Sequence, residues 1–172
     1  MNSVRDRTIG GLRGIDVAAT VLVVVCLLAL AMLMRDERIA GGAFAVDGDT
    51  LVMDGRRIRL RGLDAPELSQ TCERGGVTYR CGEEAKAAAR ALIVGQPVSC
   101  LARGRDRYDR LLANCTVRGQ DIGADLVRRG LVVSYGGYES EEREARDARR
   151  GLWAGSFETP QTWRRRHGED RL

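Results

Sequence analysis

Three acidic side chains that stand close together in the sequence are the residues of this chain best suited to chemistry. Asp49, Asp64 and Glu67 lie within residues 46–67, which read VDGDTLVMDGRRIRLRGLDAPE. Carboxylate oxygens are ligands of calcium and magnesium, and a carboxylate can also take a proton from an attacking water. Taken singly, each aspartate is better explained as a turn-forming residue. That explanation does not account for Glu67, or for Arg59 in the same stretch.

The stretch is predicted to form a β-hairpin that gathers these side chains. Apolar residues alternate with arginine over residues 56–63, as in a strand with one buried face. The Asp-Gly dipeptide at 54–55 lies between two apolar-alternating runs, which is the strongest short-range signal for a hairpin. Such a hairpin would bring Asp49 back towards Asp64. Both could then act as metal ligands, with a backbone carbonyl near Ala65 and waters filling the other positions.

The scarcity of histidine narrows the chemistry. The single histidine, His167, lies in the last residues of the chain, which argues against Ser-His-Asp, Cys-His and histidine-based nuclease sites. A general base would then be a carboxylate, and a cationic stabilising group would be an arginine. Lysine occurs once, and arginine supplies the rest of a basic balance with a formal net charge of +4. This composition suits a phosphate-bearing partner, although genome composition explains the arginine bias equally well.

A second charged segment, residues 106–110 with the sequence DRYDR, places arginine beside an aromatic ring. Its simplest explanation is a solvated hairpin tip. Tyr108 in this segment, and Tyr135 and Tyr138 later in the chain, could stack on a nucleobase. Half-buried packing explains these tyrosines equally well. Arg107, next to Tyr108, is a further candidate for contact with a substrate.

The elements that position these residues are short strands with helices inserted between them. Strands are predicted at residues 43–53, 56–63, 98–102, 111–117 and 131–134. Helices are predicted at residues 82–94, 121–129 and 141–150. Ser140 is the predicted N-cap of the third helix. Residues 68–80 are predicted to be a loop, and residues 155–172 a polar basic tail. This order is typical of a small closed barrel decorated by helices rather than of βαβ units.

An apolar run precedes the predicted domain. Residues 17–34 carry no charge, and as a helix they would span ~27 Å, close to the hydrocarbon thickness of a bilayer. Arginine is in excess before the run, which places residues 1–16 in the cytoplasm and the rest of the chain outside it. We expect an uncleaved transmembrane anchor followed by a linker over residues 35–43; a cleaved signal peptide is the alternative. Both alternatives export the domain to the periplasm or the cell exterior.

Cysteine usage agrees with export. Cys26 lies in the apolar run, and the other four cysteines form an even set with three possible pairings. Local geometry favours Cys72–Cys81, which closes a Gly-containing loop, and Cys100–Cys115, which ties two neighbouring strands. Each bond would stabilise the fold by roughly 2–3 kcal/mol. The alternative to two disulfides is a zinc site formed by the four cysteines, but the sequence contains no Cys-x-x-Cys pair.

Five sequence blocks, taken in order, resemble the staphylococcal nuclease (thermonuclease) family. They are DGDT at 47–50, RLRGLDAPE at 59–67, DRYDR at 106–110, LVRRGL at 126–131 and GLW at 151–153. Their order and spacing match over about residues 44–154, the whole predicted domain. The resemblance implies an α+β fold, an OB-fold β-barrel of five strands with three helices. It also implies calcium-dependent hydrolysis of DNA and RNA at the P–O5′ bond, leaving 3′-phosphate ends.

The resemblance assigns roles to individual residues. The carried-over calcium ligands are Asp49, Asp64 and the backbone carbonyl of Ala65. Glu67 resembles the carboxylate that activates or positions the attacking water. Arg59 and Arg110 resemble the two arginines that clamp the phosphate and stabilise the transition state. These roles agree with the chemistry expected from the residue types alone.

Two residues depart from the family pattern. Ala65 stands where the best-known member has threonine, which matters little because only the carbonyl is needed. Asp109 replaces the glycine usual before the second arginine, and its negative charge would weaken phosphate binding by Arg110. A non-catalytic OB-fold module that binds nucleic acid or protein is the alternative function, but the complete set of carboxylates and arginines favours the enzyme. We expect a monomeric nuclease domain held at the cell inner membrane by the N-terminal helix.

Overall fold

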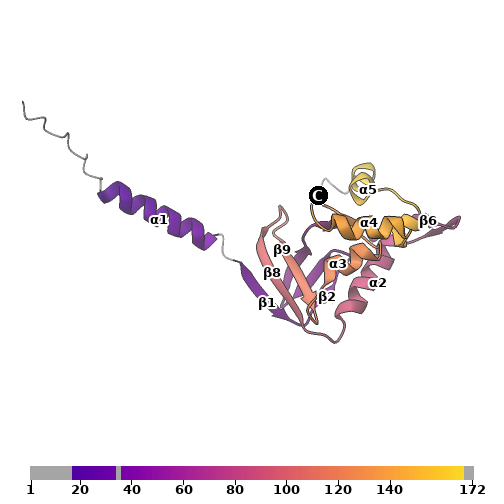
Figure 1. Ribbon diagram of the computed structural model, residues 1–172, viewed down its shortest axis with the longest axis horizontal. Helices are drawn as coiled ribbons and strands as arrows, with labels where there is room; N and C mark the ends of the chain where they lie inside the picture. Colours follow the sequence, from indigo (N-terminus) through magenta and orange to yellow (C-terminus); the bar gives the residue numbers. More distant parts are fainter. Residues whose placement is uncertain (1–16, 34–35, 169–172) are drawn as a thin grey trace, which may run out of the picture. The chain divides into compact units, whose positions relative to one another are not determined.

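The computed structural model describes residues 17–33 and 36–168. The chain divides into two compact units, residues 1–35 and residues 36–172. The first contains helix α1 (Val17–Leu33) of 17 residues (Figure 1). Within the described ranges no helix is long and apolar enough to cross a membrane, so the predicted transmembrane helix is not supported. The predicted cytoplasmic segment lies outside the described residues.

The second unit is built on a curled sheet (Figure 1). Its strands follow the order β1 (Glu37–Gly41), β8 (Val98–Arg105), β9 (Leu111–Val117), β4 (Arg56–Leu60), β3 (Thr50–Met53) and β2 (Phe44–Ala45). A seventh strand, β10 (Gln120–Asp121), pairs with β9. Neighbouring strands are antiparallel except β4 and β9, which are parallel. This is an α+β, OB-like fold, with more strands than the five that were predicted.

The predicted hairpin is confirmed. Strands β3 and β4 are joined by Asp54 and Gly55, which both have positive φ, 49° and 73°. Two consecutive residues with positive φ make the tight turn that matches the twist of a hairpin. The register pairs Thr50 with Arg59, so the polar ends of the two strands lie side by side. The core receives alternate side chains of both strands: Leu51, Met53, Ile58 and Leu60.

Four α-helices belong to the second unit: α2 (Cys81–Ile93), α3 (Ile122–Arg128), α4 (Glu139–Asp147) and α5 (Pro160–His167). The alanine-rich face of α2 packs into the core, and α3 lies between β9 and α4 (Figure 1). Among the described residues, the second unit thus has four α-helices rather than the three predicted for the domain, and α1 lies in the first unit. The predicted N-cap Ser140 is wrong, because α4 begins after Tyr138, which adopts a left-handed conformation, and no side chain caps the helix.

Three segments that were predicted to be irregular contain ordered elements. The predicted linker contains β1, which pairs with β8 along its whole length. The predicted 68–80 loop contains a hairpin of β6 (Cys72–Arg74) and β7 (Val77–Tyr79). The predicted tail begins with β12 (Gly155–Ser156), which adds to β6, and continues into α5. A 3-10 helix, η1 (Gly151–Ala154), leads into β12, and β5 (Leu63–Asp64) pairs with β11 (Val133–Ser134).

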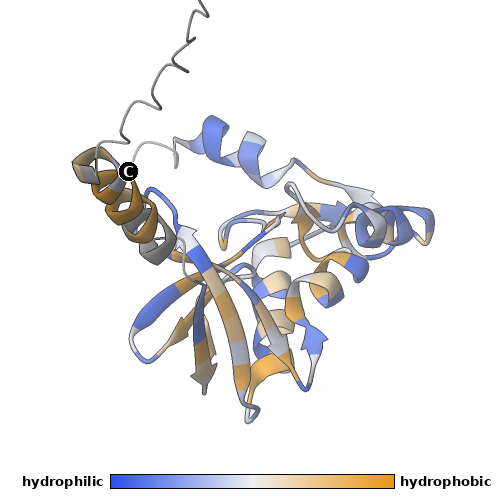
Figure 2. Cartoon of the chain, turned by 60° about the vertical axis from the view of Figure 1, so that its left-hand side comes forward, coloured by the Kyte–Doolittle hydropathy of each residue, from blue (hydrophilic) through white to orange (hydrophobic). Residues whose placement is uncertain are grey.

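Both favoured disulfide pairings are confirmed. Cys72–Cys81 joins β6 to the start of α2, with a Cα–Cα distance of 5.7 Å. Cys100–Cys115 joins the paired strands β8 and β9, with a Cα–Cα distance of 4.1 Å. Cys26 is free and exposed. Hydrophobic residues recur along the strands of the sheet, whereas α5 is mainly hydrophilic (Figure 2).

Candidate active site

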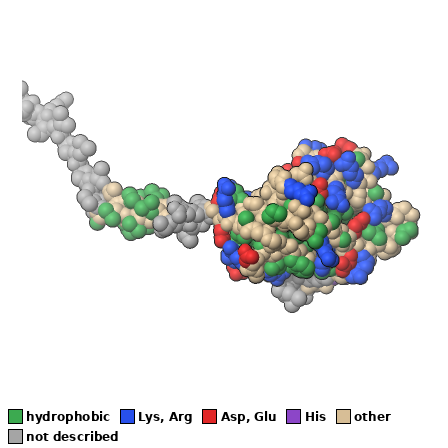
Figure 3. Space-filling view, turned by 90° about the horizontal axis from the view of Figure 1, so that it is seen from below, with side chains coloured by type: hydrophobic (Ala, Val, Ile, Leu, Met, Phe, Trp, Pro, Cys, Tyr) green, Lys and Arg blue, Asp and Glu red, His purple; other side chains and the backbone are tan. Residues whose placement is uncertain are grey.

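One open cavity, of about 940 Å³, brings most of the predicted site residues together. Its walls come from the end of the β3–β4 hairpin, the turn after β5, the 106–110 loop and helix α5. The predicted residues that line it are Asp49, Arg59, Asp64, Ala65, Glu67, Arg107, Tyr108, Arg110 and Tyr135. On the face shown in Figure 3, basic and acidic side chains are interspersed over the second unit. Within the cavity, the carboxylates of Asp49 and Asp64 are buried.

Asp49 is a buried carboxylate at the floor of this cavity, with only 4% of its surface exposed. Its Oδ2 lies 2.5 Å from Arg59 Nη1 and accepts the Ala65 N–H at 3.0 Å. Its Oδ1 accepts the Thr50 hydroxyl at 3.0 Å. Burial raises the pKa of Asp49, and the guanidinium of Arg59 opposes that rise. Asp47, by contrast, forms a turn, because its Oδ1 accepts the backbone N–H groups of Asp49 and Thr50.

Arg59 lies between the two buried aspartates. Its Nη2 donates to Asp64 Oδ1 at 2.9 Å, while Nη1 faces Asp49. Asp64 is 2% exposed. Burial lowers the pKa of Arg59, but the charges of Asp49 and Asp64 raise it by more. The arginine therefore stays charged and holds both carboxylates in place.

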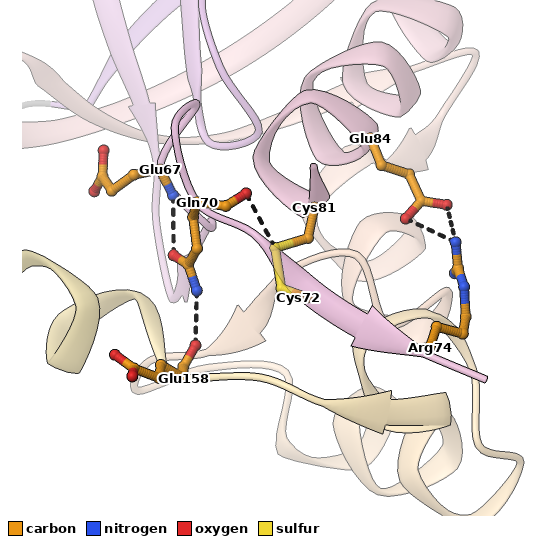
Figure 4. Close-up of a disulfide and its surroundings, with 7 residues drawn as sticks. All are labelled: Glu67, Gln70, Cys72, Arg74, Cys81, Glu84 and Glu158. Atoms are coloured by element: carbon orange, nitrogen blue, oxygen red, sulfur yellow. Dashed lines mark hydrogen bonds and ion pairs between the residues drawn. A yellow bond between two sulfur atoms is a disulfide. The ribbon is translucent and has the colours of Figure 1, made fainter. Parts of the chain in front are cut away.

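Glu67 is positioned by its own backbone and by a buried glutamine. The N–H of Glu67 donates to Gln70 Oε1 at 3.2 Å, and the N–H of Gln70 donates to the carbonyl of Glu67 at 2.8 Å. The Gln70 side chain is fully buried, and its Nε2 donates to the carbonyl of Glu158 at 2.8 Å (Figure 4). Gly82, near the start of α2, packs so closely on this turn that a Cβ there would overlap the carbonyl of Glu67. Gln70 was not predicted, because a glutamine in a loop carries no sequence signal for burial.

Arg110 is directed into the cavity by Asp106. Its Nε donates to Asp106 Oδ2 at 2.7 Å, and Asp106 Oδ1 accepts the backbone N–H groups of Tyr108 and Arg110. The far end of Arg110 reaches Thr50, with Nη1 at 3.2 Å from Oγ1. Because the Thr50 hydroxyl also bonds Asp49, the 106–110 loop is linked to the carboxylates. The ring of Tyr108 lies under both Arg107 and Arg110.

The charge of Asp109 is not directed at Arg110. Asp109 is a highly exposed residue whose Oδ1 lies 3.0 Å from Arg105 Nη1. Its φ is 61°, in the left-handed region that favours glycine. The aspartate thus occupies a left-handed backbone position that glycine adopts more readily. The acidic partner of Arg110 is Asp106.

The three tyrosines beside the predicted site have different positions. Tyr108 and Tyr135 line the cavity, and Tyr135 is 62% exposed. Tyr138 lies outside the cavity lining. Its hydroxyl donates to Asp121 Oδ1 at 3.0 Å and accepts from Asn114 Nδ2 at 3.0 Å. Its position gives no support to the predicted stacking on a nucleobase, because these bonds hold it against α3.

Helix α5 contributes two cavity residues that were not predicted from the sequence. Gln161 and Arg164 line the cavity. Arg164 donates through Nη2 to Asp64 Oδ2 at 2.9 Å and through Nη1 to Glu67 Oε1 at 2.9 Å. Partial burial lowers the pKa of Arg164, but the hydrogen bonds to Asp64 and Glu67 raise it by more. The only signal in the sequence was the arginine run at 164–166, which is hard to distinguish from a basic tail.

The carboxylate oxygens of Asp49 and Asp64 are ligands of the kind that a hard divalent cation prefers. Asp49 and Asp64 are buried oxygen donors that already face a positive group, Arg59. In the part of the chain that the structure describes, no three acidic, histidine or cysteine side chains lie close enough together to hold an ion. The carbonyl of Ala65 and waters would have to complete the ligand set.

The comparison with known proteins agrees with this geometry. The family described as "Staphylococcal nuclease homologue" matches residues 57–155, which hold the β4 strand, the carboxylate turn and the 106–110 loop. This chain belongs to the staphylococcal nuclease family.

Several curated relatives share this domain. The chain is 36% identical over 125 residues to "Succinoglycan biosynthesis protein ExoI" of Rhizobium meliloti (strain 1021), covering 68% of this chain and 65% of that protein. It is 32% identical over 136 residues to "Probable endonuclease LCL3" of Schizophyllum commune, covering 65% of this chain and 46% of that protein. An "Uncharacterized endonuclease" of Escherichia coli O157:H7 is 33% identical over 133 residues, covering 70% of this chain and 81% of that protein. The chain thus spans less than two thirds of the first two relatives.

Proposed function

We propose that this member of the staphylococcal nuclease family hydrolyses phosphodiester bonds of DNA and RNA with the help of Ca²⁺. The observation that carries the proposal is the cavity in which Arg59 and Arg110 lie with the carboxylates of Asp49, Asp64 and Glu67. Phosphodiester hydrolysis needs the phosphate charge neutralised and a water activated. Two relatives named as endonucleases support the same reaction.

The roles of the side chains follow from their positions. Arg59 and Arg110 donate hydrogen bonds to the phosphate oxygens, on which negative charge builds up in the transition state. Glu67 accepts the proton of the attacking water or holds that water in line. Thr50 links the two halves of the cavity, because its hydroxyl bonds both Asp49 and Arg110. Arg107 with Tyr108, and Tyr135 across the cavity, contact the nucleotides that flank the cleaved bond.

Asp49, Asp64 and the carbonyl of Ala65 would hold the calcium ion. When bound, the ion would supply positive charge beside the phosphate and lower the pKa of a bound water. Their burial fits this role, because a dry carboxylate pair attracts a cation more strongly than an exposed pair. The site is completed within one chain, so we propose that the nuclease domain acts as a monomer.

The two disulfides support a location outside the cytoplasm. Cysteine pairs of this kind persist in oxidising compartments and are rare in reducing ones. We propose that the domain acts in the periplasm or outside the cell, and labelling of Cys72 and Cys81 in intact cells before and after reduction would test this.

The decisive experiment is cleavage by the full-length chain purified with its disulfides intact. A mild detergent would keep α1 in solution, because this helix has exposed apolar side chains. We expect single-stranded DNA and RNA to be cut with calcium and left intact with chelator. Glu67→Gln should lower the rate by about 10²–10⁴-fold, the usual contribution of a general acid or base. Glu73→Gln, on the exposed side of β6, is the matched control. A folded wild-type chain that cuts neither substrate with any divalent cation would refute the proposal.

One observation favours a second function, a nucleic-acid or protein binding module. Arg164 bonds Asp64 and Glu67, so the residues that the reaction needs are engaged within the chain. One relative is also named "Succinoglycan biosynthesis protein ExoI" rather than as a nuclease. A binding module would retain oligonucleotides without cutting them, and Glu67→Gln would leave that affinity unchanged.

A further inference from the structure

Helix α5 puts the guanidinium of Arg164 into the cavity, where it shares Asp64 Oδ1 with Arg59. Arg164 Nη1 and Nη2 lie 3.2 Å and 2.9 Å from the two carboxylate oxygens of Asp64, and Nη1 lies 2.9 Å from Glu67 Oε1. Arg164 thus bridges a predicted metal ligand and the predicted base. A bidentate guanidinium contact of this kind is directional and strong.

The helix that carries Arg164 is fixed to the rest of the site. The strand before it, β12, pairs with β6, and β6 is joined to α2 by the Cys72–Cys81 disulfide. The carbonyl of Glu158 accepts a hydrogen bond from Gln70, the same buried side chain that holds the backbone of Glu67 (Figure 4). The side chain of Thr159 then caps α5 by accepting the N–H of Thr162. The position of Arg164 is therefore set by the fold and is not that of a free tail.

Arg164 uses the oxygen atoms that a cation would need. Asp64 Oδ1 already accepts from Arg59, and Arg164 engages both Oδ1 and Oδ2. A divalent ion bound to Asp64 would also place two positive charges beside the guanidinium. Direct coordination by Asp64 and the full Arg164 contact thus compete for the same lone pairs and the same negative charge.

We propose that Arg164 is a built-in counter-cation that competes with the divalent metal ion for Asp64 and Glu67. While Arg164 contacts Asp64, its guanidinium also occupies Oε1 of Glu67. A metal ion bound at Asp64 would displace the guanidinium and so remove its contact with Glu67. This regulation rests on the proposed nuclease function of the same cavity, but it concerns the affinity for the ion and can be measured without a substrate.

The test is the calcium affinity of the full-length chain, measured by isothermal titration calorimetry. Arg164→Gln removes the competing charge and should tighten calcium binding by roughly 5- to 150-fold, the usual range for coupled sites. Arg164→Lys keeps one charge but loses the bidentate contact, so its affinity should lie between those of the wild type and Arg164→Gln. Arg165→Gln is the matched control, because Arg165 is exposed on the same helix and contacts Thr162. Thermal melting of each variant would confirm that it is folded.

The outcomes separate this inference from the proposed function. Tighter binding in Arg164→Gln, with Arg165→Gln unchanged, supports the competition whether or not the chain cuts nucleic acid. Unchanged or weaker binding in Arg164→Gln overturns it, and so does a wild-type chain that binds no divalent ion while it still cuts nucleic acid. If Arg164→Gln does not fold, Arg164→Lys decides: affinity equal to the wild type would also overturn the competition.

Discussion

Arg110 takes its direction from Asp106, four residues earlier, rather than from its neighbour Asp109. The carboxylate of Asp106 receives the Nε–H of Arg110 and two backbone N–H groups of the same loop. The hydrogen bonds of Arg110 lower the pKa of Asp106, although burial acts in the opposite direction. This carboxylate therefore stays charged, and it orients the guanidinium towards Thr50.

Replacement of Asp106 should therefore damage catalysis. Asp106→Asn would leave Arg110 without its charged partner, and misplacement of a phosphate contact by about 1 Å can lower the rate by ~100-fold. Asp109→Asn is the control, because Asp109 contacts Arg105 outside the cavity. Steady-state cleavage of a short oligonucleotide would give kcat/KM for both variants. An equal loss in the two variants would show that Asp106 does not position Arg110.

The buried hydroxyl of Tyr138 leads to a prediction on how the stability of the fold depends on pH. Burial, together with the charge of Asp121, raises the pKa of Tyr138 to about 12 from an ordinary value of 10.0. The folded state thus holds this proton more tightly than the unfolded state. Its contribution to stability is present below pH 10 and is lost as the pH rises through about 12.

Urea unfolding across this alkaline range would measure the effect. The free energy of unfolding of the wild type should fall with rising pH, and Tyr138→Phe should fall less steeply because the titrating hydroxyl is gone. Tyr135→Phe, at an exposed position, should keep the wild-type slope. Tyr79, whose pKa is also raised by burial, is common to all three proteins, so their difference isolates Tyr138. Identical slopes in the two variants would contradict the assignment.

At the scale of elements, the strands and helices that have a strong local sequence pattern were predicted correctly. The β3–β4 hairpin has alternating side chains and an Asp-Gly turn, and α2 has an alanine face with a glycine stop, so both were found. Strand β1 and helix α5 were missed. Strand β1 is ordered by pairing with β8, about sixty residues later in the chain, and a window of neighbouring residues does not contain that information. Helix α5 is short and polar, and its place depends on β12 and Gln70.

At this scale, the close packing of Gly82 in helix α2 leads to a prediction on stability. Alanine normally stabilises a helix interior relative to glycine by about 1 kcal/mol. Here its Cβ would overlap the backbone of Glu67 and Leu68, so we expect Gly82→Ala to destabilise the fold by about 1–3 kcal/mol, the usual range for overpacking.

The same substitution should move Glu67 and lower kcat. Gly42→Ala is the control, because a Cβ there has open space around it. Thermal unfolding and cleavage rates would be measured together. A more stable Gly82→Ala with full activity would show that α2 does not position the Glu67 turn.

At the scale of the whole molecule, the cavity joins parts of the chain that are distant in sequence. The carboxylates and Arg59 come from 49–67, Arg110 from the 106–110 loop, and Arg164 from α5. The first two were predicted because each carries a compact motif. Neither motif contains information on which other segments close the cavity, so Arg164 and Gln70 became visible only in the fold.

The two disulfides should affect this assembly differently. In the chain-entropy model, loss of either bond lowers the free energy of unfolding by roughly 2–3 kcal/mol, because the closed loops have similar lengths. Cys100–Cys115 ties two strands that already pair along their length. Cys72–Cys81 instead joins β6 to α2, and Cys81 Sγ lies 3.5 Å from the carbonyl of Gln70 (Figure 4).

We therefore expect the double variant Cys72→Ser with Cys81→Ser to lose both stability and kcat, whereas Cys100→Ser with Cys115→Ser loses stability alone. Chemical denaturation would show that the two variants are destabilised to a similar degree, and cleavage would be measured well below either unfolding midpoint. A similar kcat in both variants would mean that the Cys72–Cys81 bond acts on global stability only. A selective loss in the first variant would place the β6–α2 junction, with Gln70 beside it, in control of the geometry of Glu67.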